Sequence, residues 1–247
     1  MITKTLLCLT ALGLATGASA QENGISFRFG VGPNSTPGYF GADENEISPT
    51  GSFKLEKLQF RNLSLGGPRD DGLSFGGSVR YVGARSASDF AELAGLDDVD
   101  ASFELGGGPR YTQQGYEVFA DLRYGIIGHE SLVGEVGGDL ILSLAPQVTL
   151  RVGPRLLWGS DDYAQTYFGV TPAESAASDF DSFDAQSGWL SAGIKAEASY
   201  QFNDDWGVTG TLRYDQLQGD AAESPITQSE DQVSASFVVT RKVTIGF

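Results

Sequence analysis

The chain has 247 residues, with 16 basic and 32 acidic side chains, 33 glycines and a formal net charge of −16 at pH 7. Nucleic-acid binding needs clustered basic residues that contact phosphates, so we expect no nucleic-acid partner for a chain this acidic. The glycine content, many short alternating segments and no long apolar run predict an all-β chain without a membrane-spanning helix.

Residues 1–20 have the pattern of a secretory signal peptide. One lysine precedes a mainly apolar run, and Ala18-Ser19-Ala20 forms a cleavage site. The run is too short for a membrane anchor, and Cys8 is too far from the cleavage point to be the lipidated residue of a lipoprotein. We therefore expect a mature barrel domain of residues 21–247 without cysteine, in which 15 basic and 32 acidic residues give a net charge of −17.

Eleven segments of the mature chain alternate apolar residues with polar or small ones, as β-strands with one apolar face do. The first four cover residues 24–32, 46–55, 58–66 and 72–82. Single-chain bacterial barrels have an even number of strands. Either 46–55 and 58–66 are one long strand with a bulge near Glu56-Lys57, or a further strand exists. We predict twelve strands, with ten as the alternative.

The aromatic residues favour an antiparallel transmembrane β-barrel over a secreted β-sandwich, which would also alternate. The last strand has one apolar face and ends in Phe247, which is typical of outer-membrane barrels whose last strand is read by the barrel assembly machinery. We therefore predict an outer-membrane protein that contacts outer-membrane lipid, with Phe247 as its assembly signal. The residues expected to form the interfacial girdles are Tyr81, Tyr111, Tyr124, Trp158, Trp189, Tyr200, Phe202, Trp206 and Tyr214.

Loop lengths predict the orientation, because membrane barrels place short turns in the periplasm and long loops outside. With a periplasmic C-terminus, all six clear connections fall on the expected side. The short ones are at 112–115, 145–147 and 203–205, and the long ones at 83–98, 159–186 and 217–231.

The face of the strands predicted to point inward carries charges of both signs. Mixed charges in a small barrel can pair across the lumen and fill it, so we predict a narrow or occluded interior; the alternative is a solvated wall without selectivity. The predicted inward residues are Arg28, Arg80, Glu104, Arg110, Glu117, Asp121, Arg123, Glu135, Asp139, Arg151, Arg155, Lys195, Glu197, Arg213 and Asp215.

Few residues indicate catalysis or metal binding, and we predict no catalytic residue, metal or cofactor. His129, the only histidine, lies two residues before Ser131 in a short loop; we interpret it as a loop hydrogen-bonding residue, since no nucleophile and base pair is evident. Gly106-Gly107-Gly108 is interpreted as a packing or bend feature of a strand. One long loop has carboxylates that suit Ca²⁺, but without EF-hand spacing we prefer a solvated acidic loop; these are Asp161, Asp162, Asp179, Asp181 and Asp184.

One stretch of the chain runs from Trp158 through Asp161, Asp162 and Tyr163 and continues with Tyr167, Phe168 and Gly169. This stretch resembles the central signature of the MipA/OmpV family of outer-membrane proteins. Similar pieces occur around Leu93-Ala94-Gly95-Leu96, Gly128-His129 and Leu217-x-Gly219-Asp220-Ala221, so the resemblance covers essentially the whole mature chain. These seven signature residues are a candidate loop or partner patch, and we expect their aromatic rings to pack the loop over the barrel mouth.

The resemblance implies an outer-membrane barrel without enzyme activity. It further implies a scaffold in cell-envelope (murein) maintenance, joining a lytic murein transglycosylase to a penicillin-binding murein synthase. A narrow channel for small solutes is the alternative, and an outer-membrane enzyme is the weakest hypothesis. A scaffold needs periplasmic surface, yet loop 159–186 is expected outside. Either the orientation is inverted, the loop folds into the barrel, or the protein acts at the cell surface.

Overall fold

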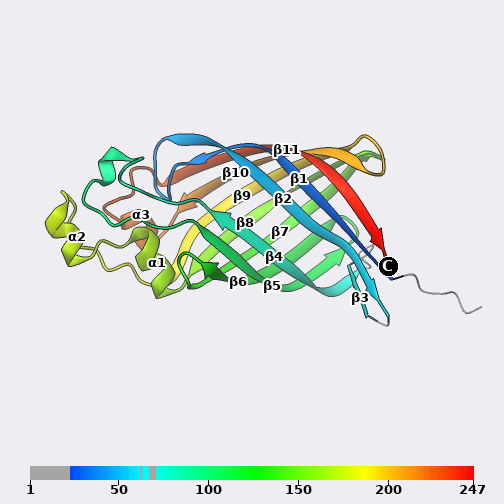
Figure 1. The fold of residues 1–247 in the computed structure, drawn as a ribbon, viewed down its shortest axis with the longest axis horizontal. Coiled ribbons are helices and arrows are strands. Elements are labelled where there is room, and N and C mark those ends of the chain that lie inside the picture. The colour runs from blue at the N-terminus through cyan, green and yellow to red at the C-terminus, as the bar shows by residue number, and fades with distance from the viewer. Residues whose placement is uncertain (1–22, 62, 67–70) are drawn as a thin grey trace, which may run out of the picture.

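The computed structural model describes residues 23–61, 63–66 and 71–247, in which eleven antiparallel strands form one curled sheet around a lumen (Figure 1). The expected signal peptide and Cys8 lie outside the described residues. The strands are β1 (Gly24–Pro37), β2 (Asn45–Phe60), β3 (Leu63–Gly66), β4 (Gly72–Val82), β5 (Ser102–Gln113), β6 (Tyr116–Ile127), β7 (Leu132–Ala145), β8 (Val148–Gly159), β9 (Gly188–Gln201), β10 (Trp206–Leu217) and β11 (Asp231–Gly246).

The strand order in the sheet is β3-β2-β1-β11-β10-β9-β8-β7-β6-β5-β4. The first and last long strands are therefore neighbours, paired from Gly24↔Gly246 to Ser35↔Ala235. Because neighbouring strands are antiparallel, the connections alternate between two ends of the sheet. This arrangement agrees with the predicted antiparallel barrel.

A bulge explains the odd number of alternating segments. In the pairing of β2 with β1, Ser26 lies opposite Lys57 and Phe27 lies opposite Leu55, so Glu56 is an extra residue on β2. Segment 46–55 thus continues through the bulge to Phe60, but the predicted segment 58–66 is not a single strand. Residues 63–66 form the separate strand β3, which pairs antiparallel with the end of β2 from Lys57↔Gly66 to Phe60↔Leu63. β3 has only four residues, and the other ten strands have 11 to 16. The described residues therefore contain ten strands of spanning length, the alternative to the predicted twelve.

The two ends of the barrel differ as the loop lengths predicted. Short turns join β5 to β6, β7 to β8 and β9 to β10 at the end that also holds the C-terminus (Figure 1); we call this the turn end. The long connections lie at the opposite loop end with four short helices: η1 (Ala91–Leu93), α1 (Asp161–Phe168), α2 (Pro172–Ala177) and α3 (Asp220–Glu223). No helix among the described residues is long and apolar enough to span a membrane.

Apolar side chains cover the outer face of the strands. Leu73 and Phe75 on β4 are each 79% exposed, and Leu122, Leu140 and Leu212 are also exposed. Eight of the nine predicted girdle aromatics are exposed, whereas Trp158 is half-buried. A soluble sheet would bury such a face, so this surface fits contact with lipid.

The Gly106-Gly107-Gly108 segment of β5 allows its neighbours to approach closely. A Cβ atom at Gly106 would overlap the carbonyl oxygen of Leu122 on β6, and one at Gly108 would overlap that of Ala120. At Gly107 it would overlap the carbonyl oxygen of Gly76 on β4. The three glycines therefore allow close packing of the wall, the packing alternative of the sequence interpretation.

Replacing Gly108 should destabilise the barrel. We expect Gly108→Ala to lower the free energy of unfolding in urea by about 2–3 kcal/mol, because the new Cβ must displace backbone. Gly210→Ala on β10 is the matched control, since a Cβ added at Gly210 would have no neighbouring atom within 4 Å; it should change stability by less than about 0.5 kcal/mol. Equal stability of the two variants would contradict the packing role.

Candidate functional site: the loop plug and the lumen ion pairs

The short helix α1 begins where the signature sequence begins. Ser160 caps its N-terminus by accepting a hydrogen bond from the backbone of Tyr163 at 3.4 Å. Asp161 and Asp162 occupy the first turn, where carboxylates interact favourably with the helix dipole. The Asp161 carboxylate also accepts the backbone N–H of Ser187 at 2.7 Å, which lowers the pKa of Asp161. These contacts fix both ends of the loop 159–186.

One face of α1 is buried in the mouth of the barrel. Tyr163, Tyr167 and Phe168 are 0%, 3% and 1% exposed. The ring of Phe40, from the β1–β2 connection, lies 5.1 Å from Tyr167 and 5.8 Å from Phe168 between centroids. The buried side chains around them come from α1 itself, β7, β8, β9, β10, α3 and the segment after α2, and are Val133, Leu157, Ala164, Ala185, Leu190, Leu217 and Ala221.

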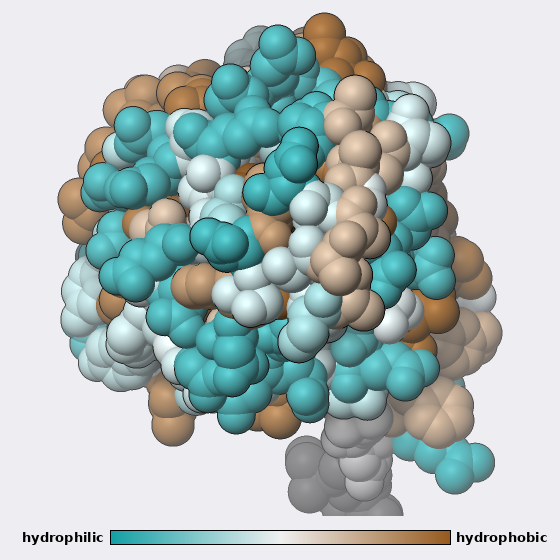
Figure 2. Space-filling model, turned by 90° about the vertical axis from the view of Figure 1, so that its left-hand side faces the viewer, coloured by the Kyte–Doolittle hydropathy of each residue, from teal (hydrophilic) through white to brown (hydrophobic). Residues whose placement is uncertain are grey.

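A second apolar cluster joins the remaining loops. Leu93 of the loop 83–98, Val170 and Ile226 are each 1% exposed and pack with Tyr39 and Leu96. Phe183 packs against both clusters, so all long connections meet in one body, which we call the loop plug: residues 38–44, 83–101, 160–187 and 218–230. Figure 2, viewed from the loop end, shows mainly hydrophilic side chains across this surface.

The helix α2 links two loops of the plug through its capping box. The Thr171 hydroxyl accepts the backbone N–H of Glu174 at 3.2 Å, and the Glu174 carboxylate accepts that of Thr171 at 2.8 Å. The same carboxylate accepts the backbone N–H of Asp97 at 3.0 Å. Burial would raise the pKa of Glu174, but these N–H donors hold it below its usual range. Loop 159–186 is thereby tied to loop 83–98.

The plug is hydrogen-bonded to the lumen wall through Tyr163. Its hydroxyl accepts a hydrogen bond from Nη2 of Arg80 on β4 at 2.7 Å. Burial raises the pKa of Tyr163 to about 12, so the phenol is neutral at physiological pH. Arg80 also donates to the carboxylate of Glu104 on β5, at 2.8 and 2.6 Å.

His129 is a second link between the plug and the wall. Its Nδ1 lies 2.6 Å from Ser131 Oγ and accepts the Ser131 backbone N–H at 3.1 Å, which leaves the Nε2 hydrogen to donate to Glu104 at 3.3 Å. Its ring lies 4.9 Å from Tyr163 between centroids. Ser131, His129 and Glu104 are at most 9% exposed. This agrees with a hydrogen-bonding role, although the partner on β5 was not visible in the sequence.

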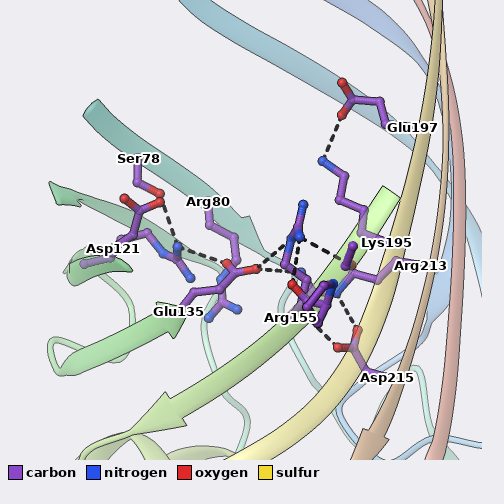
Figure 3. Close-up of polar contacts among 12 residues, drawn as sticks. Ser78, Arg80, Asp121, Glu135, Arg155, Lys195, Glu197, Arg213 and Asp215 are labelled. Carbon is purple, nitrogen blue, oxygen red and sulfur yellow. Dashed lines mark hydrogen bonds and ion pairs between the residues drawn. The ribbon is translucent and has the colours of Figure 1, made fainter. Parts of the chain in front are cut away.

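Glu104 begins a network of ion pairs across the lumen wall. Arg123 on β6 donates to Glu104 at 2.9 Å and to Glu135 on β7 at 3.2 Å. Glu135 in turn accepts from Arg213 on β10 at 3.1 Å, and Arg213 pairs with Asp215 at 2.5 and 3.0 Å. Figure 3 shows Arg80, Glu135, Arg213 and Asp215 pointing toward one another inside the barrel.

A second branch of the network lies nearer the turn end. Arg155 on β8 pairs with Asp139 on β7 at 2.6 Å and approaches Glu135 at 3.9 Å. Asp139 and Glu117 share Arg151, each at 2.9 Å. Arg110 on β5 pairs with Asp121 at 2.9 Å and lies 3.8 Å from Glu117.

The network is electrically balanced. Fourteen of the fifteen predicted inward residues belong to the network or adjoin it. The seven basic residues are Arg80, Arg110, Arg123, Arg151, Arg155, Lys195 and Arg213, and the seven acidic residues are Glu104, Glu117, Asp121, Glu135, Asp139, Glu197 and Asp215. Lys195 pairs with Glu197 at 2.8 Å, and these two side chains are 30% and 27% exposed. They lie apart from the group around Glu135 (Figure 3), so this part of the wall is solvated.

The structure separates the seven candidate patch residues. Tyr163, Tyr167 and Phe168 lie inside the plug, Gly169 ends α1, and Trp158 is half-buried near the end of β8 opposite Trp189. Of the two aspartates, Asp161 holds the Ser187 backbone and Asp162 is exposed. The described residues contain no group of three or more histidine, cysteine, aspartate or glutamate side chains that could hold a metal ion.

Sequence reasoning missed two sets of residues. It did not place Ser102, Arg85 or Ser224, which bind the plug backbone or the nearby β6–β7 loop from buried positions. It also omitted Lys54, Glu56, Lys57 and Lys242 from the inward face. Glu56 sits on the bulge, which changes the alternation of β2, whereas Lys242 could have been found from the alternation of β11.

The fold and site define a class: an outer-membrane β-barrel whose loops form a plug and whose lumen charges are paired. Within this class, the family model described as MltA-interacting protein MipA matches residues 29–243. The chain belongs to the MipA family.

Two relatives are the MltA-interacting proteins of Escherichia coli (strain K12) and Shigella flexneri. Each is 28% identical to this chain over 240 residues, covering 90% of this chain and 93% of the relative. Among solved structures, the COG4313 outer membrane channel from Pseudomonas putida F1 has a TM-score of 0.44 and 10% identity, covering 95% of this chain and 100% of that one. Neisserial surface protein A has a TM-score of 0.29 and 8% identity, covering 90% and 99%.

Removing the Tyr163 side chain should open the plug. We expect Tyr163→Ala to lower the free energy of plug unfolding by about 3–5 kcal/mol, because it leaves a cavity and removes the acceptor of Arg80. Faster proteolysis within residues 160–187 of the folded barrel would report the opening. Asp162→Ala, on the exposed face of α1, is the control and should leave the proteolysis rate unchanged; the same rate in both variants would contradict the packing role.

Glu104 should be the most sensitive charge in the lumen. In Glu104→Gln, the buried guanidinium of Arg123 and the partly buried one of Arg80 lose their shared carboxylate, and we expect a loss of about 3–5 kcal/mol in urea unfolding. Glu197→Gln removes the carboxylate of a half-exposed pair and should cost at most about 1 kcal/mol. A smaller loss for Glu104→Gln than for Glu197→Gln would refute this order.

Proposed function

We propose that this protein is a structural scaffold of the outer membrane that takes part in murein maintenance and does not conduct solutes. The observation that carries the proposal is the filled loop end: the loop plug occupies one mouth and joins an ion-pair network of equal positive and negative charge. A solute path through this wall would require buried charges to separate, which is strongly unfavourable when one partner is left unpaired.

The relatives support a role in binding other proteins. Two proteins 28% identical over most of both chains are named MltA-interacting protein. We infer that this chain likewise binds a lytic murein transglycosylase, and a penicillin-binding murein synthase as a second partner. The burial of the signature loop supports the interpretation in which this loop folds into the barrel, so the partner surface lies elsewhere.

We assign the turn end to the periplasm, because short turns face that side in barrels of this class. This places Phe247, which is 62% exposed and stacks 6.2 Å from Phe60, at the periplasmic rim as the assembly signal. Removal of residues 1–20 as a signal peptide belongs to the same proposal. The murein enzymes act in the periplasm, so the turn end is the surface they would meet.

A narrow channel is a second candidate function. The half-exposed pair of Lys195 and Glu197 shows that one side of the lumen wall is solvated. On β10 the neighbouring inward positions are Thr209 and Thr211, which are short and polar. This solvated side favours a water path, but the plug closes the loop end above it.

Single-channel recording and a pull-down decide between the two functions. We expect the refolded mature protein to be silent in a planar bilayer and to retain a purified murein transglycosylase on a column. Discrete, salt-dependent openings altered in Asp161→Ala/Asp162→Ala would instead establish a channel gated by loop 159–186. A silent, heat-modifiable barrel that retains neither murein enzyme would overturn the scaffold proposal.

A further inference from the structure

The sheet has two edges that are not joined to each other. Its strand order begins with β3 and β2 and ends with β4, and β4 pairs only with β5 among the described strands. β3 covers only the turn-end part of the β2 edge, from Lys57 to Phe60. Figure 1 shows β2 and β4 on the same side of the barrel. We call the interval between these two strands the seam.

Outward side chains that flank the seam are more exposed than those of central strands. Leu73 and Phe75 on β4 are each 79% exposed, and Ile47 on β2 is 82% exposed. On the central strands β6 and β7, the outward Leu122 and Leu140 are 52% and 57% exposed. Side chains inside a sheet are partly covered by neighbours on both adjacent strands. The side chains at the seam therefore lack one of these two neighbours.

The backbone of β4 presents hydrogen-bonding groups to the seam. A Cβ atom at Gly107 of β5 would overlap the carbonyl oxygen of Gly76, so this carbonyl points toward β5. Along an antiparallel strand, the N–H and C=O groups of alternate residues point to opposite neighbours. Those of the odd-numbered residues from Phe75 to Tyr81 thus point into the seam, where the described residues give them no backbone partner. Open sheet edges are unfavourable in lipid, because each unpaired group is costly there.

The β2 edge is interrupted, whereas the β4 edge is continuous. On β2, Pro49 has no N–H, the bulge at Glu56 breaks the alternation, and β3 already pairs with the turn-end residues. Prolines, bulges and charged residues are features that keep edge strands from pairing with other strands. β4 has no proline and no bulge, and Arg80 is its only charged residue. Closure of the seam by β2 is therefore disfavoured, and β4 is the edge suited to a further strand.

A second copy of the chain fits the β4 edge less well. Barrels of one kind share one orientation in the membrane, so two neighbouring β4 strands would run in the same direction. All strand pairs of this sheet are antiparallel. The β2 strand of a second copy would run antiparallel to β4, but it has the same interruptions. The edge is therefore better suited to a segment of another protein.

The two faces of β4 define the chemistry of a strand that fits beside it. The outward side chains are Leu73, Phe75, Val79 and Tyr81, and the inward residues before Arg80 are Ser74, Gly76 and Ser78. Side chains on the same face of adjacent strands pack against each other. A segment that alternates apolar with small polar residues would thus place its apolar side chains toward lipid and its polar ones toward the lumen.

We propose that the β4 edge, from Phe75 to Tyr81, is a docking site for an extended segment of a partner protein in which apolar and small polar residues alternate. The segment adds a strand to the sheet: main-chain hydrogen bonds provide affinity, and the alternation provides specificity. Because the loop plug fills the loop end, the segment approaches from the turn end. This inference rests on the proposed scaffold function and gives it a surface and a partner chemistry.

Fluorescence anisotropy with two labelled peptides of equal composition tests the edge directly. The probe has the core Thr-Val-Thr-Val-Thr-Val-Thr between lysines, and the control has the core Val-Val-Val-Thr-Thr-Thr-Thr between the same lysines. The refolded mature protein in detergent should bind the alternating peptide about tenfold or more tightly than the control, because only that peptide matches both faces of β4. Equal Kd values for the two peptides would overturn the proposal, and so would the absence of binding.

Two substitutions at Val79 separate the backbone of the edge from its side chain. Val79→Pro removes an N–H that points into the seam and should raise the Kd of the alternating peptide about tenfold. Val79→Ala keeps this N–H and should change Kd less than about threefold. Proline is tolerated on edge strands, and heat-modifiability on gels checks that both variants are folded. The same Kd for both variants would refute main-chain pairing.

Amide hydrogen exchange of the unmodified protein tests the edge without a variant. In the absence of peptide, the odd-numbered amides from Gly77 to Tyr81 should exchange about tenfold or more faster than the even-numbered amides from Gly76 to Arg80, which face β5. The alternating peptide should remove this difference by pairing with the edge. Equally slow exchange of both sets without peptide would show that the edge is already paired and would overturn the proposal.

Two further arms identify the occupant and isolate the inference. The peptide assay contains no murein enzyme, so its failure is distinct from failure of the scaffold pull-down. If Val79→Pro retains the murein enzymes as well as the parent protein does, the scaffold stands and docking at the β4 edge is refuted. A dimer of the parent protein that Val79→Pro converts to a monomer would assign the edge to a second copy and would likewise overturn the proposal.

Discussion

The carboxylate of Glu104 is the constraint on which the interior depends. It is 0% exposed and accepts from Arg80, Arg123 and His129. A buried charge is tolerated only when it is paired and hydrogen-bonded. Its three donors come from β4, β6 and the β6–β7 loop, so the position of one side chain fixes these elements relative to each other. Through Arg80 and Tyr163 it also fixes the depth of α1 in the mouth.

The glycines of β5 make this arrangement geometrically feasible. Gly106 and Gly108 follow Glu104 on the same face and leave no side chain between the charged residues of neighbouring strands. Close approach of β5 to β6 and β4 narrows the lumen, so side chains from facing strands can meet. A wider barrel would place water between the same charges, where pairs contribute little. The close packing of β5 and the ion pairs of the lumen therefore depend on each other, and a change in either affects both.

Alternation in the sequence predicted the wall well, because the period of a strand is fixed by its geometry. The fourteen charges of the network, the tight glycine segment and a bulge near Glu56-Lys57 all follow from it. The pairing partners of these charges could not be predicted from alternation, because register depends on turns and on contacts between distant strands. The inward positions of Glu56 and Lys57 were missed because the bulge changes the alternation of β2. Helix α1 was also unexpected, since eight residues in a loop give a weak periodic signal, although Ser160 followed by Asp161 and Asp162 is a helix start.

The pairing of charges in the lumen opposes gating as the way this barrel works. Opening the lumen would separate pairs such as Arg123–Glu104, and each buried charge left alone costs about 3–5 kcal/mol. A single ligand contact supplies less than this, so a solute would have to disturb several pairs at once. A rigid interior of paired charges therefore acts as a support and not as a gate.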